Sequence, residues 1–278
     1  MTNNIQYFRP TNVDDASALL GTPNSRTRAI AGGSSLAFDA SINADILVDL
    51  SQLGLDQIER QDRQLHVGAM TNMQTLVENG YALPENDPLR LLCLAAHDMA
   101  AVGLRQRITL GGAIATADSA SPIVTALLAL NAEVLLFTPN GKDKRKTVAL
   151  AGLLGYQSQV LKAGVLILGV IIPATSEASV MRYAKVARTP ADYPIVCAAS
   201  VCVMGKDLIE TVRVAVGGVA EMPLTLNQLG IELAKKPLSH LDSALASALA
   251  ELNPPSNWLG SSDYRREMAG VLIKRNLS

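Results

Sequence analysis

Short apolar runs alternate with helically spaced apolar positions over the first 174 residues of the chain. The runs predict strands, and apolar positions that repeat every three or four residues predict helices. Capping residues mark where helices begin: Asn12, the capping-box sequence from Thr71 to Gln74, and Asp87 followed by Pro88. The predicted strands are 27–31, 46–50, 64–70, 133–138 and 165–172; the predicted helices are 13–20, 71–80, 88–102 and 123–130; and 139–142 is a predicted reverse turn.

The pattern changes beyond residues 175–177. Longer strands are predicted there, and three helices end the chain. In the last helix Tyr264, Met268, Val271 and Leu272 stand at positions i, i+4, i+7 and i+8, which predicts its packing face. The predicted strands are 180–186, 194–204 and 210–216, and the predicted helices are about 226–235, 239–251 and 262–276. The mixed order favours the α+β class in two parts, divided near residue 175.

Two segments combine paired glycines with hydroxyl residues. One runs from Ala29 to Leu36 and the other from Thr109 to Ser119. Glycine permits sharp turns and lets a ligand approach the backbone, and exposed N–H groups in such a turn form an anion-binding concavity. We predict two loops that face one phosphate-bearing ligand. Taken singly, each segment is more often an ordinary turn, and neither has the Rossmann or the phosphate-loop spacing.

Composition and charge narrow the class of protein. A chain of 278 residues with 49% hydrophobic and 18% charged residues is globular and long enough for two subdomains. Lys and Arg number 24 against 25 Asp and Glu, so no basic field favours nucleic acid or a membrane surface. Only 4% of the residues are aromatic, which disfavours base-stacking platforms.

The cysteines and histidines form no metal motif. Cys93, Cys197 and Cys202 are too few for an iron–sulfur cluster, which needs about four thiolates. Free, reduced cysteines are typical of the cytoplasm. The first ten residues lack the basic and apolar regions of a signal peptide, and the apolar run 164–172 is too short to span a bilayer. We expect a soluble cytoplasmic protein without a metal site of its own.

Five segments together resemble the FAD-binding subunit of the molybdenum hydroxylases, a family that includes bacterial xanthine, carbon monoxide, aldehyde and N-heterocycle dehydrogenases. The resemblance covers nearly the whole chain, and the matches occur in the family's order. Ala113 stands where the family usually has Asn, and the family's Q-[IV]-R-N run is shortened to residues 106–108. The five segments are 31–36 (A-G-G-[TH]-S/D-L), 109–115 (T-[IL]-G-G-N-[IL]-A), 183–192 (Y-x-K-x-x-x-R-x-x-x-D), 217–220 (G-G-V-A) and 262–266, the Y-R segment that opens the last helix.

The resemblance implies a fold and a set of cofactor-binding residues. The fold is a two-subdomain FAD-binding domain of the vanillyl-alcohol oxidase (PCMH) type at 1–174, with subdomains at about 1–54 and 55–174. A smaller C-terminal α+β domain of the CO dehydrogenase flavoprotein type follows at 175–278. No residue is expected to be catalytic, because the flavin supplies the redox chemistry. The implied FAD-binding residues are Ile30, Ala31, Gly32, Gly33, Ser34, Ser35, Leu36, Thr109, Gly111, Gly112, Ala115, Thr116, Asp118, Ile167 and Lys185.

The resemblance implies that different residues of this set contact different parts of FAD. The pyrophosphate would lie against the N–H groups of residues 32–36 without a net positive site, since neither glycine segment contains Lys or Arg. Asp118 would accept a hydrogen bond from a ribose hydroxyl, although it is equally placed to favour the dipole of the following helix. Ile167 and Tyr193 would lie near the flavin or simply pack, and Lys185 would lie near the cofactor or in solvent.

The implied function is electron transfer within a larger enzyme. FAD would receive electrons from a small [2Fe-2S] subunit and pass them to NAD⁺ or another acceptor, while a large subunit with a molybdenum cofactor oxidises the substrate. A heterotrimer or its dimer is expected, without nucleic acid. Two alternatives stay open: a standalone FAD-dependent reductase of the same fold, and a flavin-free assembly or scaffold protein.

Overall fold

The computed structural model describes residues 5–35, 43–140 and 143–278. The chain forms two compact units, and each is built from several separate stretches. The first unit contains residues 1–75, 102–116 and 133–171, and the second contains 76–101, 117–132 and 172–278. The α+β class predicted from the sequence is confirmed.

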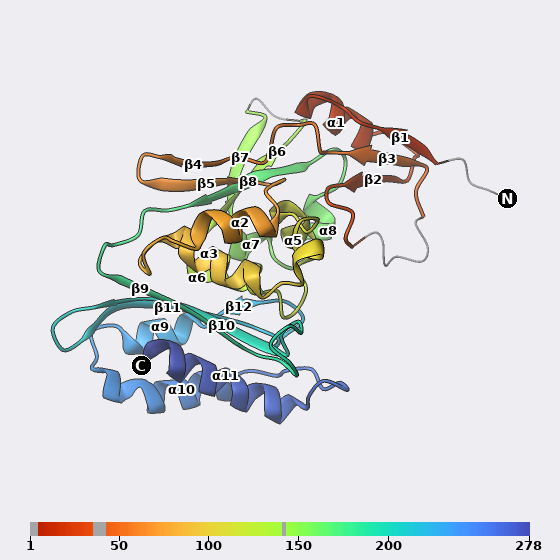
Figure 1. Cartoon of the computed structure of the whole chain (residues 1–278). Coiled ribbons are helices and arrows are strands. Elements are labelled where there is room, and N and C mark those ends of the chain that lie inside the picture. The colour runs from red at the N-terminus through yellow and green to blue at the C-terminus, as the bar shows by residue number, and fades with distance from the viewer. Residues whose placement is uncertain (1–4, 36–42, 141–142) are drawn as a thin grey trace. The chain divides into compact units, whose positions relative to one another are not determined.

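A small parallel sheet opens the first unit (Figure 1). Its strands lie in the order β1-β3-β2, and both pairs are parallel. Helix α1 (Val13–Leu20) packs on this sheet, and its N-cap Asn12 accepts a hydrogen bond from the N–H of Asp15, as the sequence predicts. The strands are β1 (Gln6–Phe8), β2 (Thr27–Ile30) and β3 (Ile46–Asp49).

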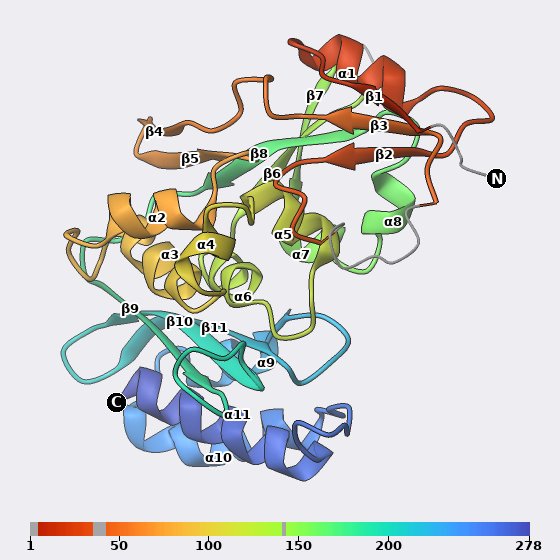
Figure 2. The ribbon, with the colours of Figure 1, turned by 45° about the vertical axis from the view of Figure 1, so that its right-hand side comes forward.

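The second sheet of this unit has five strands in the order β4-β5-β8-β6-β7 (Figure 2). Its strands are β4 (Ile58–Gln61), β5 (Gln64–Gly68), β6 (Glu133–Phe137), β7 (Arg145–Ala149) and β8 (Leu166–Ile172). A shared apolar cluster joins the two sheets to α1, with Ala16, Val48 and Leu168 among its members. Short helices complete the unit: α4 (Val102–Arg105), α5 (Leu110–Thr116), α7 (Leu150–Leu153) and α8 (Gln157–Val160).

The second unit is an antiparallel sheet covered by helices on both faces (Figures 1 and 2). Helices α3 (Pro88–His97) and α6 (Pro122–Ala129) cover one face. The other face is covered by α9 (Asn227–Leu233), α10 (Leu241–Ala250) and α11 (Ser262–Leu277), with a 3₁₀ turn at Leu238–His240. The strand order is β12 (Leu224–Thr225), β11 (Ile209–Gly217), β10 (Val196–Met204), β9 (Ser179–Val186). Helix α2 (Met73–Gly80) runs from the first unit into the second.

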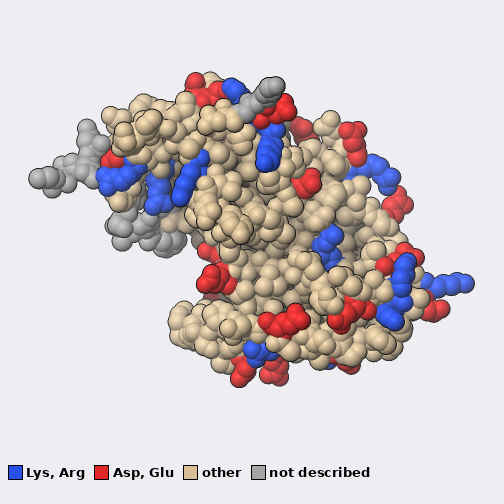
Figure 3. Space-filling model, turned by 180° about the vertical axis from the view of Figure 1, so that it is seen from behind, with Lys and Arg blue, Asp and Glu red and all other residues tan. Residues whose placement is uncertain are grey.

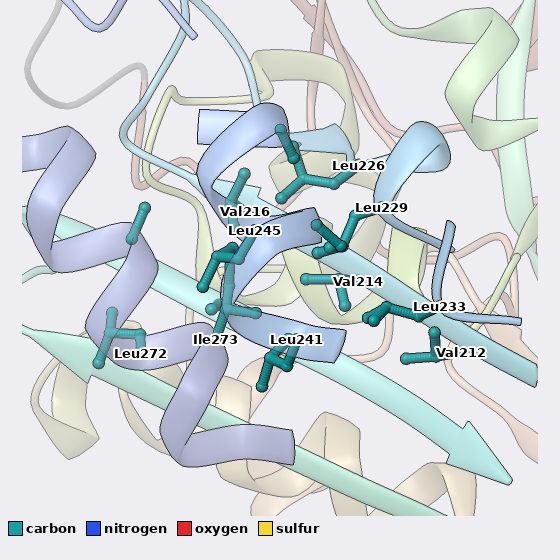
Figure 4. Packing of buried hydrophobic residues seen from close by; sticks show 14 of the residues in the cluster. Val212, Val214, Val216, Leu226, Leu229, Leu233, Leu241, Leu245, Leu272 and Ile273 are labelled. Carbon is teal, nitrogen blue, oxygen red and sulfur yellow. The ribbon is translucent and has the colours of Figure 1, made fainter. Parts of the chain in front are cut away.

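The largest apolar core of the second unit lies between its sheet and the three C-terminal helices. Figure 4 shows Val212, Val214 and Val216 of β11 facing leucines of α9 and α10. Because both sheet faces are covered, residues 196–200 of β10 are buried without interruption. This explains why the sequence shows a continuous apolar run there instead of alternation.

One capping prediction is wrong. The capping box from Thr71 to Gln74 places Thr71 at the N-cap, but α2 begins at Met73, and the Asn72 side chain accepts from the N–H of Thr75 at 2.9 Å. The Thr71 hydroxyl is buried with no hydrogen-bond partner among the described residues. Asn is as good an N-cap as Thr, and a shift of one residue lets Thr71 accept the N–H of Leu110 with its carbonyl oxygen.

The predicted packing face of the last helix is also offset. Leu272 of the predicted face is buried and Met268 packs against the core, but Tyr264 and Val271 are exposed, and the buried face of α11 also carries Arg265, Ala269, Ile273 and Asn276. The spacing of this buried set is again helical, but it includes two polar residues that donate to main-chain carbonyls. A pattern built from apolar residues alone therefore overlaps the buried face only in part.

Leucine-to-alanine substitution tests this assignment. Leu272 is 2% exposed and Val271 is 42% exposed. We expect Leu272→Ala to lower the free energy of unfolding by about 2–5 kcal/mol, because it leaves a cavity in the core. The neighbouring control Val271→Ala should change it by less than about 1 kcal/mol. Urea unfolding followed by circular dichroism measures both, and equal losses would show that the predicted stripe was right.

Elements that the sequence did not predict are short or polar. Strand β1 has three exposed residues, and β4 reads Ile-Glu-Arg-Gln, so neither shows an apolar rhythm. The predicted turn at 139–142 lies partly outside the described residues, at 141 and 142. Figure 3 shows acidic and basic side chains on one face, in keeping with the formal net charge of −1. Within 5–35, 43–140 and 143–278, no helix is long and apolar enough to cross a membrane.

Candidate functional site

The first glycine segment lies at the carboxyl edge of the parallel sheet. Strand β2 ends at Ile30, whose carbonyl oxygen accepts the N–H of Leu50 at 2.9 Å. Residues 31–35 then leave the sheet as a turn, and Leu36 lies outside the described residues. Ligands of open sheets with parallel strands bind beyond the carboxyl ends of those strands. The segment therefore stands where such a sheet binds its ligand.

This turn carries several hydrogen-bond donors without a partner. In the described part of the chain, no acceptor is found for the backbone N–H groups of Gly32, Gly33, Ser34 and Ser35, or for the two serine hydroxyls. Gly33 has φ +70°, a left-handed conformation that turns successive N–H groups toward one concavity. Such a set of hydrogen-bond donors is suited to bind an anion.

A close backbone contact fixes the shape of the turn. A Cβ on Gly32 would lie 1.4 Å from the carbonyl oxygen of Arg107, so only glycine fits there. The Arg107 side chain folds back over the turn, and its Nε donates to the carbonyl oxygen of Gly32 at 3.2 Å. Its Nη2 is 3.3 Å from the position that a Cβ on Gly33 would take. The two glycine-rich stretches of the sequence thus meet through Arg107.

The second glycine segment is a helix, so its prediction as a loop is wrong. Helix α5 spans Leu110–Thr116 and includes both glycines. The Thr109 hydroxyl accepts the N–H of Gly112 at 3.2 Å, and its carbonyl oxygen accepts that of Ala113 at 2.9 Å. A threonine cap and the packing of Gly111 against Ala69, where a Cβ would meet the alanine Cβ at 2.8 Å, override the low helix propensity of glycine.

The donors of this helix are already used inside the unit. The N–H of Gly111 donates to the carbonyl oxygen of Ala69 at 2.8 Å, and the N–H of Gly112 is held by Thr109. The Thr116 hydroxyl donates back to the carbonyl oxygen of Gly112 at 3.1 Å, while Ala115 is exposed beside it. Helix α5 can offer a ligand close approach but not the N–H groups of its two glycines. Ile167, on β8 of the same unit, is 8% exposed and pairs with Leu136 in the ladder.

Lys185 belongs to the second unit and is engaged there. Its Nζ lies 3.4 Å from a carboxylate oxygen of Asp98 and donates to the carbonyl oxygens of Pro190 and Asp192 at 2.9 and 3.1 Å. The side chain is 12% exposed, so it is not the free lysine in solvent that the alternative describes. It ties the segment after β9 to the end of α3. The partner Asp98 was not singled out in the sequence, since no local pattern joins it to Lys185.

Asp118 and Tyr193 lie near each other in the same unit. Asp118 is exposed, three residues before the α6 N-cap Ser121. Burial is the main cause that raises the pKa of Tyr193, with the Asp118 carboxylate adding to it and a hydrogen bond with Ser121 opposing it. The tyrosine is therefore a neutral hydrogen-bonding group at neutral pH.

Cys197 is a fully buried thiol in the second unit. Its Sγ lies 3.4 Å from the Thr125 hydroxyl and 3.6 Å from the carbonyl oxygen of Ala120. Burial raises its pKa to about 12. In 5–35, 43–140 and 143–278, no group of three or more His, Cys, Asp or Glu side chains is placed to hold a metal ion.

Thiol labelling checks this burial. Because burial raises the pKa of Cys197, much less of it is thiolate at pH 8 than in a free cysteine. We expect the folded chain to resist a disulfide reagent at Cys197 for hours, while the chain in guanidinium reacts at all three cysteines within minutes. Peptide mass spectrometry identifies the labelled residue. Rapid labelling of Cys197 without denaturant would contradict its position in the core.

Comparison with known proteins identifies the class. A family model described as “FAD binding domain in molybdopterin dehydrogenase” matches residues 3–175, and one described as “CO dehydrogenase flavoprotein C-terminal domain” matches residues 181–278. The first covers more than half of the chain. The chain therefore belongs to the FAD-binding family of the molybdopterin dehydrogenases, and the resemblance noted from the sequence is confirmed.

Individual relatives are medium subunits of oxidoreductases. The nicotine 6-hydroxylase medium subunit of Paenarthrobacter nicotinovorans is 30% identical, over 98% of this chain and 96% of its own. The glyceraldehyde dehydrogenase medium chain of Sulfolobus acidocaldarius is 29% identical, over 97% and 95%. Among solved structures, a carbon monoxide dehydrogenase chain from Hydrogenophaga pseudoflava matches with a TM-score of 0.88 at 28% identity, covering 98% of this chain and 95% of that one. The expected fold of a FAD-binding domain followed by a flavoprotein C-terminal domain is confirmed.

Proposed function

We propose that this chain holds FAD with its pyrophosphate against residues 32–35. The observation that carries the proposal is the set of unpartnered N–H and hydroxyl donors there, at the carboxyl edge of the parallel sheet. Gly33 has no Cβ and a φ of +70°, so the turn there lets a ligand approach the backbone closely. When bound, FAD supplies the redox chemistry, and the chain supplies its position and electrostatic surroundings.

The other FAD-binding residues implied by the resemblance belong to the same proposal, and the structure changes the role of some of them. Leu36 is the next residue in the sequence and lies outside the described residues, Ile30 and Ala31 lead into the turn, and α5 provides close approach through Gly111, Gly112, Ala115 and Thr116. Thr109 caps α5, and Ile167 is a buried residue of β8. As contacts implied by the resemblance alone, Asp118 stays proposed for a ribose hydroxyl and Lys185 for the isoalloxazine or adenine end of the cofactor. We propose that the FAD-binding domain spans residues 1–174 and the C-terminal domain residues 175–278.

The finer proposal concerns the path of electrons. The chain would receive electrons from a small [2Fe-2S] subunit and pass them through FAD to NAD⁺ or another acceptor, while a large molybdenum subunit oxidises the substrate. The relatives' designation as medium chains supports such a complex, as do three cysteines, all buried and free, which are too few to hold a cluster. We propose a heterotrimer or its dimer, located in the cytoplasm.

A visible absorption spectrum of the purified chain tests the cofactor. We expect a flavin spectrum and the release of one FAD per chain on denaturation. A colourless, folded chain that takes up no FAD would refute the proposal and favour the scaffold alternative. FMN in place of FAD would remove the reason for a pyrophosphate site.

Reconstitution with the partner subunits tests the electron path. We expect substrate-dependent reduction of the acceptor only when all three subunits are combined. Turnover by this chain alone with NADH and a small-molecule acceptor would instead support the standalone reductase.

A further inference from the structure

We propose that Arg107 supplies the positive charge of the anion site at residues 32–35, acting as a direct ligand of the cofactor's pyrophosphate. The inference rests on the proposed FAD site but changes its electrostatics. From the sequence, the site is expected to be uncharged, because neither glycine segment contains Lys or Arg. The structure brings a guanidinium to the first segment from the turn that precedes α5.

Backbone packing fixes where the guanidinium stands. The carbonyl oxygen of Arg107 would be 1.4 Å from a Cβ on Gly32, so the two main chains are in direct contact. The same side chain then reaches back across the turn, with Nε donating to Gly32 at 3.2 Å and Nη2 beside Gly33. A glycine contact and a hydrogen bond thus hold the guanidinium of this exposed side chain beside the turn.

The remaining donors of Arg107 are available to a ligand. In the described part of the chain, no carboxylate pairs with Arg107, and its guanidinium makes one hydrogen bond, from Nε to the carbonyl oxygen of Gly32. The residue is exposed. A guanidinium fork binds phosphate oxygens with two parallel hydrogen bonds. Together with the unpartnered N–H groups of residues 32–35, it forms one donor set for a diphosphate.

A purely structural role for Arg107 predicts different behaviour. If the side chain only braced the carbonyl of Gly32, its loss would loosen the turn, but the attraction between the site and an anion would keep the same dependence on salt. A charged ligand contact is screened by salt, and that screening disappears when the charge is removed. Salt dependence therefore separates the two roles.

The test is FAD and ADP affinity of the full chain, freed of flavin, at low and high NaCl. We expect Arg107→Gln to weaken FAD binding about tenfold or more at low salt and to flatten its salt dependence. Arg107→Lys keeps the positive charge but loses the two parallel donors of the guanidinium. Its FAD affinity should therefore lie between those of the wild type and Arg107→Gln. The matched control is Arg145→Gln on β7, an exposed arginine of the same unit whose loss changes net charge equally.

Each possible result of these binding measurements either supports or overturns the inference. Wild-type affinity and salt dependence in Arg107→Gln would overturn the inference, and so would a weaker affinity that keeps the full salt dependence. ADP binding that needs Arg107, in a chain that takes up no FAD, would support the anion site and refute the proposed function. A wild-type chain that binds neither ADP nor FAD would refute both.

Discussion

Replacing Arg265 with methionine is expected to lower the free energy of unfolding by about 2–4 kcal/mol. Arg265 is 4% exposed, on the buried face of α11. One Nη donates to the carbonyl oxygens of Ile195 and Gly218 at 2.7 and 3.0 Å, and the other donates to Asn257 at 2.8 Å. Without the guanidinium, the two carbonyl oxygens lose this donor in the core, whereas the exposed Asn257 can turn to water.

Two effects oppose each other in this substitution. Leaving a buried acceptor unpaired costs about 1–3 kcal/mol, and two buried carbonyl oxygens, of Ile195 and Gly218, are involved. Removing the charge recovers the cost of burying it, which is visible in the lowered pKa of Arg265 caused by that burial. Among the described residues no carboxylate pairs with Arg265, and its Nε is buried without a partner. The guanidinium is stabilised by the three acceptors of its two Nη atoms, and we expect the loss of their hydrogen bonds to dominate.

Urea unfolding followed by circular dichroism measures the effect. The single tryptophan, Trp258, adjoins Asn257 and reports the same region by fluorescence. The control is Arg275→Met, an exposed arginine of the same helix, which should change stability by less than about 0.5 kcal/mol. Equal stability of the two variants would show that the buried arginine is dispensable.

Replacing Gly32 with alanine is expected to reduce the FAD content of the purified chain more than tenfold. The added Cβ would lie 1.4 Å from one backbone atom of Arg107 and 2.5 Å from the next, so the two main chains must separate. Separation moves the unpartnered donors of the turn together with the guanidinium above it. Because all of these groups are proposed to contact the same ligand, their effects on binding combine.

Flavin released per chain, read from absorbance after denaturation, measures this result. Gly103→Ala is the matched control, because a Cβ there meets nothing within 4 Å, and alanine suits helix α4. Its FAD content should equal that of the wild type. A Gly32→Ala chain that retains one FAD would place the cofactor elsewhere.

The sequence predicts local structure well where a chemical signal is local. Asn12, Asp87 and Ser121 cap the helices they precede, since a side-chain oxygen needs only the next turn as its partner. The glycines of the first turn likewise point to a sharp bend. The family can be recognised because several short sequence segments match its motifs in the same order.

What the sequence misses depends on distant contacts. Glycines 111 and 112 suggest a loop until Ala69 is seen packed against them. The face of α11 is set by Arg265 and Asn276, whose partners lie on β10, close to it, or in the turn after β11. The guanidinium of Arg107 reaches a turn more than 70 residues earlier in the chain. In each case the deciding partner is remote in sequence, so no local pattern could reveal it.

The interleaved second unit has a consequence for protein synthesis. Helices α3 and α6 come from the first half of the chain, yet they cover a sheet that ends at residue 225. All eight residues of α6 are buried in the finished structure. At a translation rate of roughly 5–20 residues per second, α6 leaves the ribosome several seconds before β10 and β11. During that interval a helix with seven apolar residues out of eight is exposed on the nascent chain, where a chaperone can bind it.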